Sequence, residues 1–206
     1  MAVTINGSGT VTGINVGGLP DGIVDTDMLA ANAVTDAKTS LNTVTHYDCW
    51  RLVTNSTDED EDPLGSVTAI ERAIDANGNK PGFGTFGDPM TQSGGIFSFP
   101  TTGYWKVEFQ VVMNCADESY NNNTSIKVTT DGGTTWEPLS SSQGSVNDDG
   151  ANNVYGANYC SLVIDVTNVS NVKVKFSGMQ QDADATILGQ ADYNRTCMMF
   201  TRIGDT

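Results

Sequence analysis

The chain has 206 residues and carries 25 acidic against 10 basic side chains, which gives a formal net charge of −15 and a pI near 4.1. Nucleic acid is bound largely by cationic groups, and anionic lipid headgroups repel an acidic surface, so neither nucleic acid nor membrane is an expected partner. The 22 glycines, with abundant Asn, Thr and Ser, favour short strands and tight turns over long helices.

Residues 1–45 form a segment that is nearly free of aromatic and basic side chains. The segment opens with a short alternating stretch and Gly-rich turns, followed by two degenerate copies of one unit at 22–30 and 32–41. Asp25 or Thr26 can cap a helical turn over residues 27–33, and Thr35 or Asp36 can cap a second turn. We therefore predict an extended and short-helical N-terminal anchor.

The apolar residues of this anchor are too few to form a core within one chain. They are Ile23, Val24, Met28, Leu29, Val34 and Leu41. The anchor must bury them against sister chains or a docking surface, which predicts a role in assembly; an unstructured tail is the alternative.

From His46 onward the sequence predicts an all-β domain, 46–206. The expected strands are Tyr47–Val53, Ser66–Arg72, Gly95–Phe99, Gly103–Met113, Thr124–Thr129, Tyr155–Val166, Val172–Ser177 and Tyr193–Ile203. Apolar and charged residues alternate most clearly at 104–111 and 172–176, as half-buried antiparallel strands require. About eight strands at short spacing favour an antiparallel jelly-roll sandwich.

The segment Gly94–Met113 resembles the C1q/TNF-like jelly-roll heads. The residues that carry the resemblance are Phe97, Phe99, Pro100, Gly103, Tyr104, Val107 and Phe109. The stretch Thr196–Gly204 is also similar to the terminal core strand of that family. The resemblance implies a homotrimer, in which one face of the sandwich packs around a threefold axis.

Residues 13–40 separately resemble the leaders of bacteriophage fibre and virion-decorating proteins, in which three chains intertwine. This resemblance implies a structural protein located in the virion, docked on other virion proteins through its N-terminal segment. Because the unit occurs at most twice, a short knob is expected rather than a long tail fibre. The predicted function is host attachment, with a host surface glycan as a further partner. A capsid decoration (cement) protein at threefold positions is the alternative, and a lectin-like or carbohydrate-active module is the second alternative.

The sequence offers little for catalysis, so no enzymatic activity is expected. His46 is the one histidine and would have to serve any serine or cysteine nucleophile, and no G-x-S-x-G motif is present. We interpret His46 as a linker residue.

Residues Thr129–Trp136 match one copy of the Asp-box motif of sialidases. A catalytic role would require several copies and an arginine cluster, whereas the four arginines are scattered. We interpret the motif as a hairpin, in which Asp131 accepts hydrogen bonds from turn amides, Gly132 and Gly133 allow positive φ, and Trp136 packs beneath the turn.

An acidic run supplies weak calcium candidates in Asp58, Asp60 and Asp62. Its spacing does not fit an EF-hand loop, because Pro63 stands where the glycine belongs, so a solvated loop without metal or cofactor is expected. Two polar stretches, 114–123 and 140–153, are predicted as surface loops that either bind a ligand or are plain surface. Their candidate contacts are Tyr120, Asn121, Asn122, Asn147 and Asp148.

The four cysteines are widely scattered and form no CxxC pair. The sequence shows no signal peptide, so reduced thiols are expected, with two disulfides as the alternative. Cys160 and Cys197 lie in strand-like runs and are predicted to be buried.

Overall fold

The structure is a computed structural model that describes residues 4–5, 11–12, 44–57, 60–66, 68–73, 85–115, 119–146, 154–179 and 185–206. The chain divides into two units, Met1–Leu41 and Asn42–Thr206. In the first unit, β1 (Thr4–Ile5) pairs antiparallel with β2 (Val11–Thr12). The predicted helical turns and the six apolar anchor residues lie outside the described residues, so the anchor stays a prediction.

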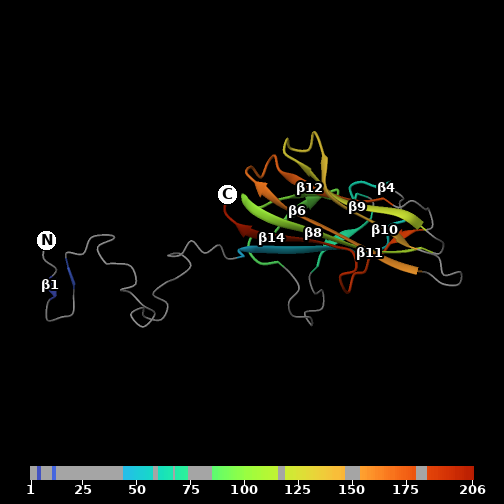
Figure 1. Ribbon diagram of the computed structural model, residues 1–206, viewed down its shortest axis with the longest axis horizontal. Coiled ribbons are helices and arrows are strands. Elements are labelled where there is room, and N and C mark those ends of the chain that lie inside the picture. Colours follow the sequence, from blue (N-terminus) through green and yellow to red (C-terminus); the bar gives the residue numbers. More distant parts are fainter. Residues whose placement is uncertain are drawn as a thin grey trace. The chain divides into compact units, whose positions relative to one another are not determined.

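The second unit is a sandwich of two antiparallel sheets, which confirms the predicted all-β jelly roll (Figure 1). The first sheet, called the β8 sheet, has the order β11 (Val154–Val166), β8 (Gly103–Cys115), β14 (Cys197–Gly204), β3 (His46–Leu52), β5 (Ile70–Arg72), and β13 (Thr186–Ile187) also pairs with β8. The second, called the β9 sheet, has the order β10 (Glu137–Val146), β9 (Ser119–Thr129), β12 (Lys173–Met179), β7 (Ile96–Ser98), β6 (Thr91–Ser93), and β4 (Asp60–Glu61) also pairs with β12. None of the described residues belongs to a helix long and apolar enough to span a membrane.

Alternation along the long strands builds the core between the two sheets. On β8 the odd-numbered side chains, such as Trp105, Val107 and Phe109, are buried, and the even-numbered ones face away from the core. Phe97 of β7 meets Phe200 of β14 with ring centroids 5.1 Å apart, so aromatic rings from both sheets interlock. This packing fixes which face of each sheet remains available to solvent.

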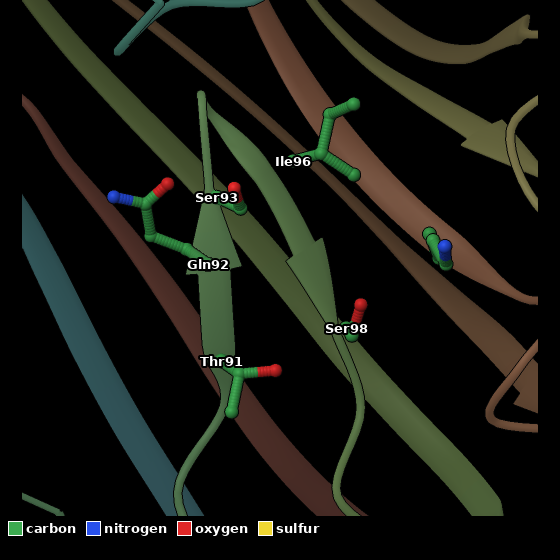
Figure 2. Close-up of a pocket in the computed structure, with 6 residues that line it drawn as sticks. Thr91, Gln92, Ser93, Ile96 and Ser98 are labelled. Carbon is green, nitrogen blue, oxygen red and sulfur yellow. The ribbon is translucent and has the colours of Figure 1, made fainter.

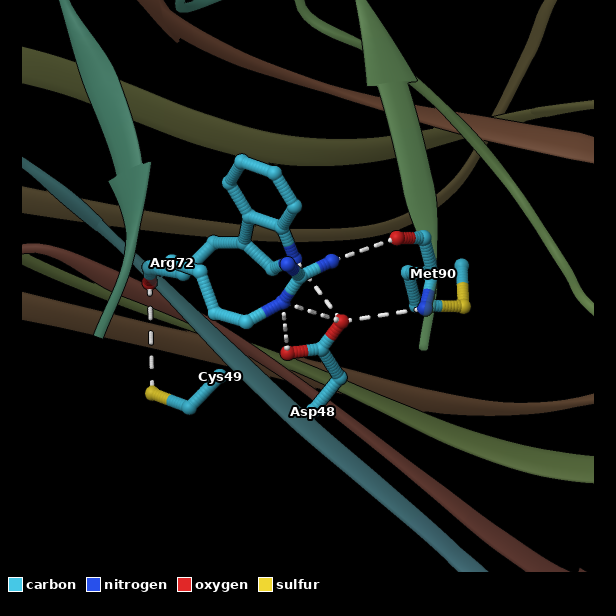
Figure 3. Close-up of polar contacts among 5 residues, drawn as sticks. Asp48, Cys49, Arg72 and Met90 are labelled. Atoms are coloured by element: carbon cyan, nitrogen blue, oxygen red, sulfur yellow. Dashed lines mark hydrogen bonds and ion pairs between the residues drawn. The ribbon is translucent and has the colours of Figure 1, made fainter. Parts of the chain in front are cut away.

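Asp48 is a buried carboxylate that ties the two sheets together (Figure 3). Arg72 Nε of β5 donates to Asp48 Oδ1 at 3.0 Å, and the backbone amide of Met90, just before β6, donates to Oδ2 at 3.0 Å. Trp50 Nε1 donates to the same Oδ2 at 3.0 Å, and Arg72 Nη2 donates to the Met90 carbonyl at 2.8 Å. A charge taken out of water needs such partners, and here they come from both layers.

Several strand predictions need correction. The strand predicted at Tyr193–Ile203 begins only at Cys197, and β9 begins at Ser119, inside the predicted loop 114–123. The strand predicted at Ser66–Arg72 begins only at Ile70, and β10 occupies Glu137–Val146, where residues 140–153 were predicted as a loop. In β10 the side chains alternate in exposure, but four of the ten residues are serine and the strand carries no apolar stripe. The strand is held by pairing with β9, a tertiary effect that local sequence does not reveal.

We predict that Asp48→Asn lowers the free energy of unfolding by about 3 kcal/mol, because the substitution leaves Arg72 without its counter-charge in a buried site. Denaturant unfolding followed by fluorescence measures the change. The control is Asp205→Asn, which removes the ion pair with Arg202 at a carboxylate that is 78% exposed, and it should leave the unfolding midpoint unchanged. Equal midpoints for both variants would contradict the role given to Asp48.

Candidate functional site

The outward side of the β8 sheet carries an unusual group of exposed large side chains. Tyr155, Tyr159 and Val163 of the edge strand β11 are 63%, 49% and 57% exposed. Their spacing of four residues places them on one side of the strand. Tyr104 of the neighbouring β8 is 42% exposed. We call these four residues the β11 face; together they form a pattern typical of an association surface rather than scattered exposed residues.

Tyr159 is held in place on this face by a charged pair. Its hydroxyl donates to Glu108 Oε1 at 2.5 Å, and Lys106 Nζ contacts the same oxygen at 2.8 Å. Burial raises the pKa of Glu108, but the hydrogen bonds from Lys106 and Tyr159 outweigh burial and set that pKa below its ordinary value. The Tyr159 ring is thus ordered before any partner arrives, which reduces the entropy cost of association.

The four cysteines are buried and unbridged. Asn194 Nδ2 donates to Cys49 Sγ at 3.4 Å. The hydrogen bond to Cys49, together with burial, raises the pKa of Cys197 far above its ordinary value, and burial raises the pKa of Cys160 to about 11. Thiols of this kind stay protonated at neutral pH and are poor nucleophiles. The prediction that Cys160 and Cys197 are buried is confirmed.

The outward side of the β9 sheet contains a polar hollow of about 350 Å³ at the end formed by β6, β7 and β12 (Figure 2). It is lined by Thr91, Gln92, Ser93, Ile96, Ser98 and Lys173. We call it the Lys173 hollow. Residues of three strands meet there because Thr91 lies opposite Ser98, and Ser98 lies opposite Lys173.

Of the three calcium candidates, the structure describes Asp60 and Asp62. Asp62 accepts hydrogen bonds from Lys127 Nζ at 2.6 Å and contacts Lys175 Nζ at 3.0 Å. Burial raises the pKa of Asp62, but the two lysines together lower it below its ordinary value. Asp62 therefore has ammonium partners in place of a metal. Asp60 is an exposed residue of β4, Asp58 lies outside the described residues, and within the described ranges no three metal-binding side chains converge.

Glu61 corrects the prediction of a solvated acidic loop. Its carboxylate is buried and accepts hydrogen bonds from Ser56 Oγ at 2.6 Å, Gly65 N at 2.9 Å and Thr68 N at 2.9 Å. Burial raises the pKa of Glu61, but the hydrogen bonds outweigh it and lower that pKa overall. The buried Glu61 carboxylate thus holds Ser56, Gly65 and Thr68 together. The acidic run in the sequence does not indicate this role.

The Asp-box hairpin is confirmed. Asp131 Oδ1 accepts from the backbone amides of Thr134 at 2.9 Å and Thr135 at 3.0 Å, and Thr135 Oγ1 donates to Oδ2 at 2.6 Å. Gly132 and Gly133 have φ of 80° and 111°. Trp136 Nε1 donates to the Gly133 carbonyl at 3.1 Å, which holds the indole against the turn.

Of the five predicted ligand residues, only Asn122 has a described side chain. Asn122 lies in β9 with its side chain buried, which corrects its assignment to an exposed loop; its carbonyl accepts from Asn158 Nδ2 at 3.0 Å. Tyr120 and Asn121 belong to the same strand, with side chains outside the described residues. Asn147 and Asp148 also lie outside the described residues. Of the stretch 140–153 that was predicted as a loop, residues 140–146 belong to β10, and residues 147–153 lie outside the described residues.

His46 begins strand β3 rather than a linker. Its Nδ1 lies 2.9 Å from Thr45 Oγ1, and its ring packs 5.6 Å from the Trp105 ring. Its partners are therefore a hydroxyl of the preceding residue and a core aromatic.

Sequence analysis did not single out Tyr155, Tyr159 and Val163 of the β11 face, nor the residues of the Lys173 hollow. Alternation within 154–166 contained the signal for the face, because Tyr155, Tyr159 and Val163 share one parity. The hollow depends on the register of three strands and has no local signal.

Comparisons with solved structures find three crystal structures of murine APRIL, at pH 8.5, pH 8.0 and pH 5.0. Their sequence identities to this chain are 13%, 11% and 13%, and their TM-scores are 0.48, 0.48 and 0.49. Each similarity covers 76% of this chain and 98% of that chain, and it concerns the TNF-like jelly-roll fold alone. No known protein family and no curated protein matches the sequence.

We predict that the Asp131 hairpin keeps its hydrogen bonds well into the acid range. The hydroxyl and amide of Thr135 and the hydroxyl of Thr129 lower the pKa of Asp131 far below its ordinary value. The stability from these bonds is therefore fully present above about pH 4, where an unfolded Asp titrates, and is lost only as pH falls through the depressed pKa.

The Thr134 and Thr135 amide resonances, followed by NMR from pH 7 to pH 3.5, should barely move. Asp131→Asn, which removes the ionisable group, supplies the reference spectrum for a hairpin that does not titrate. A titration midpoint near or above pH 4 in the unsubstituted chain would contradict the prediction.

Proposed function

We propose that this chain is a structural protein of a bacteriophage virion: a trimeric jelly-roll knob that associates through the β11 face, is anchored by residues 1–45 and serves attachment to the host surface. The virion location is supported by the resemblance of residues 13–40 to phage fibre and decoration leaders. The trimer is supported by the observation that carries the proposal, the exposure of Tyr155, Tyr159 and Val163 on one side of the sandwich.

The β11 face has the size and chemistry that protein association uses. β11 and β8 pair over all 13 residues of each strand, and a strand of that length extends for about 44 Å. Tyrosine contributes large contact area at low entropic cost and is enriched among the residues that dominate binding energy. When contacts through one association surface close around a rotation axis, they give a finite assembly instead of an aggregate.

A non-catalytic role agrees with the state of the reactive groups. The pKa of Cys160 and of Cys197 is raised; the hydrogen bond with Cys197 lowers the pKa of Cys49, but that thiol is buried. The Asp-box carboxylate of Asp131 is engaged by its own turn. The proposal thus predicts no turnover when the chain is incubated with host polysaccharides and reducing ends are measured. Measurable hydrolysis would favour the carbohydrate-active alternative.

We predict that Val163→Asp dissociates the trimer, because it adds a carboxylate to the centre of an apolar contact in an already acidic chain. Light scattering on the full-length chain should give three times 21.8 kDa before the substitution and 21.8 kDa after it.

The matched control is Leu139→Asp, since Leu139 is 61% exposed but lies on β10 of the other sheet. This variant should keep the threefold mass. A single-chain mass for the unsubstituted protein, or dissociation by the Leu139 variant as well, would refute association through the β11 face.

A further inference from the structure

We infer that the Lys173 hollow is a binding site for a carboxylated sugar, of the uronic-acid class, on a surface polysaccharide. This inference rests on the proposed attachment function and names the ligand that the knob recognises. It follows from three properties of the hollow: its geometry, its isolated cation and its hydroxyl groups.

The geometry follows directly from strand register. Thr91 of β6 lies opposite Ser98 of β7, and Ser98 lies opposite Lys173 of β12, so these three residues form one row across three strands. Their neighbours Phe97 and Val174 are fully buried, so the row itself points outward from the core. Figure 2 shows the side chains of Thr91 and Ser98 beside one another on adjacent strands. Two strand spacings give a row about 10 Å wide.

The charge of the hollow is unusual for this chain. Lys127 and Lys175 on the same sheet share Asp62 as counter-ion. Within the described part of the chain Lys173 has no ion-pair partner, and its one polar contact is the carbonyl of Gly132, at 3.3 Å from Nζ. Its ammonium retains donors for an incoming anion. A chain with net charge −15 would repel a long polyanion such as nucleic acid more strongly than a short carboxylated sugar, so the short sugar fits better.

The hydroxyl groups of the hollow suit a sugar. The side chains of Thr91, Ser93 and Ser98 each offer a hydroxyl that can donate and accept a hydrogen bond. Within the described residues, none of these three hydroxyls has a hydrogen-bond partner. Ile96 supplies an apolar contact for the face of a sugar ring. The volume of about 350 Å³ lies within the range of small-ligand sites. The Gln92 side chain is not part of this set, because Gln92 lies opposite the buried Phe97 and its Oε1 accepts from the Gly95 amide at 3.0 Å (Figure 2).

The position of the hollow is compatible with attachment. It lies on the outward side of the β9 sheet, whereas the β11 face lies on the outward side of the β8 sheet. The two outward sides of a sandwich point in opposite directions. Association through the β11 face therefore leaves the hollow open to solvent in every copy.

Isothermal titration calorimetry of the full-length chain with trigalacturonate tests the inference, with galactotriose as the neutral probe. We expect saturable binding of trigalacturonate that weakens as salt increases, and at least tenfold weaker binding of galactotriose. Lys173→Gln should weaken trigalacturonate binding at least tenfold, whereas Lys173→Arg should stay within threefold because it keeps the charge. Circular dichroism checks that each variant is folded.

The charge-matched control is Arg195→Gln. Arg195 does not line the hollow, and its guanidinium lies 5.5 Å from the Tyr193 ring centroid. Its replacement changes net charge by the same amount as Lys173→Gln and should leave affinity unchanged. Absence of binding by the unsubstituted chain, equal affinity for both probes, or an equal loss in both Gln variants would overturn the inference. Light scattering on the same samples separates the two proposals: a trimer that does not bind refutes the hollow alone, and a monomer that binds refutes the trimeric knob alone.

Discussion

The pairing of β8 with β11 over their full length is the constraint on which the rest of the structure depends. Tyr159 lies opposite Gln110, and Leu162 lies opposite Val107, in a register without interruption from Val154 to Val166. Side chains alternate with a period of two, so a slip by one residue would turn Phe109 to solvent and carry the outward residues into the core. The β8–β11 pairing thus determines which side chains of the β8 sheet are buried in the core and which face solvent.

The outward sides of the two sheets carry different kinds of side chain. The outward side of the β8 sheet holds the exposed rings of the β11 face, ordered by the contact of Tyr159 with Glu108. The outward side of the β9 sheet holds the Lys173 hollow, built from hydroxyls and one lysine. Asp48, whose partners come from β5 and from the segment before β6, keeps the two layers in fixed relation. We propose that copies of the chain associate through the first side and that a polar ligand binds the second.

The sequence predicts features whose contacts are local and conceals those whose contacts are distant. The strand at Gly103–Cys115 carries its own alternation, and the Asp131 turn closes within residues 129–136, so both were predictable. Two of the three partners of Asp48, Arg72 and Met90, lie 24 and 42 residues away, and no short motif contains them. Likewise, the serine-rich β10 has no apolar stripe of its own, and the Lys173 hollow exists only once three strands have their register.

In the proposed trimer, copies of the chain associate through the β8 sheet while the β9 sheet stays exposed. A crystal structure of the purified full-length chain tests it most directly. The account predicts threefold symmetry, with Tyr155, Tyr159 and Val163 turned toward the axis and Lys173 at the periphery. Isolated single chains, or an interface formed by the strands around Lys173, would contradict it.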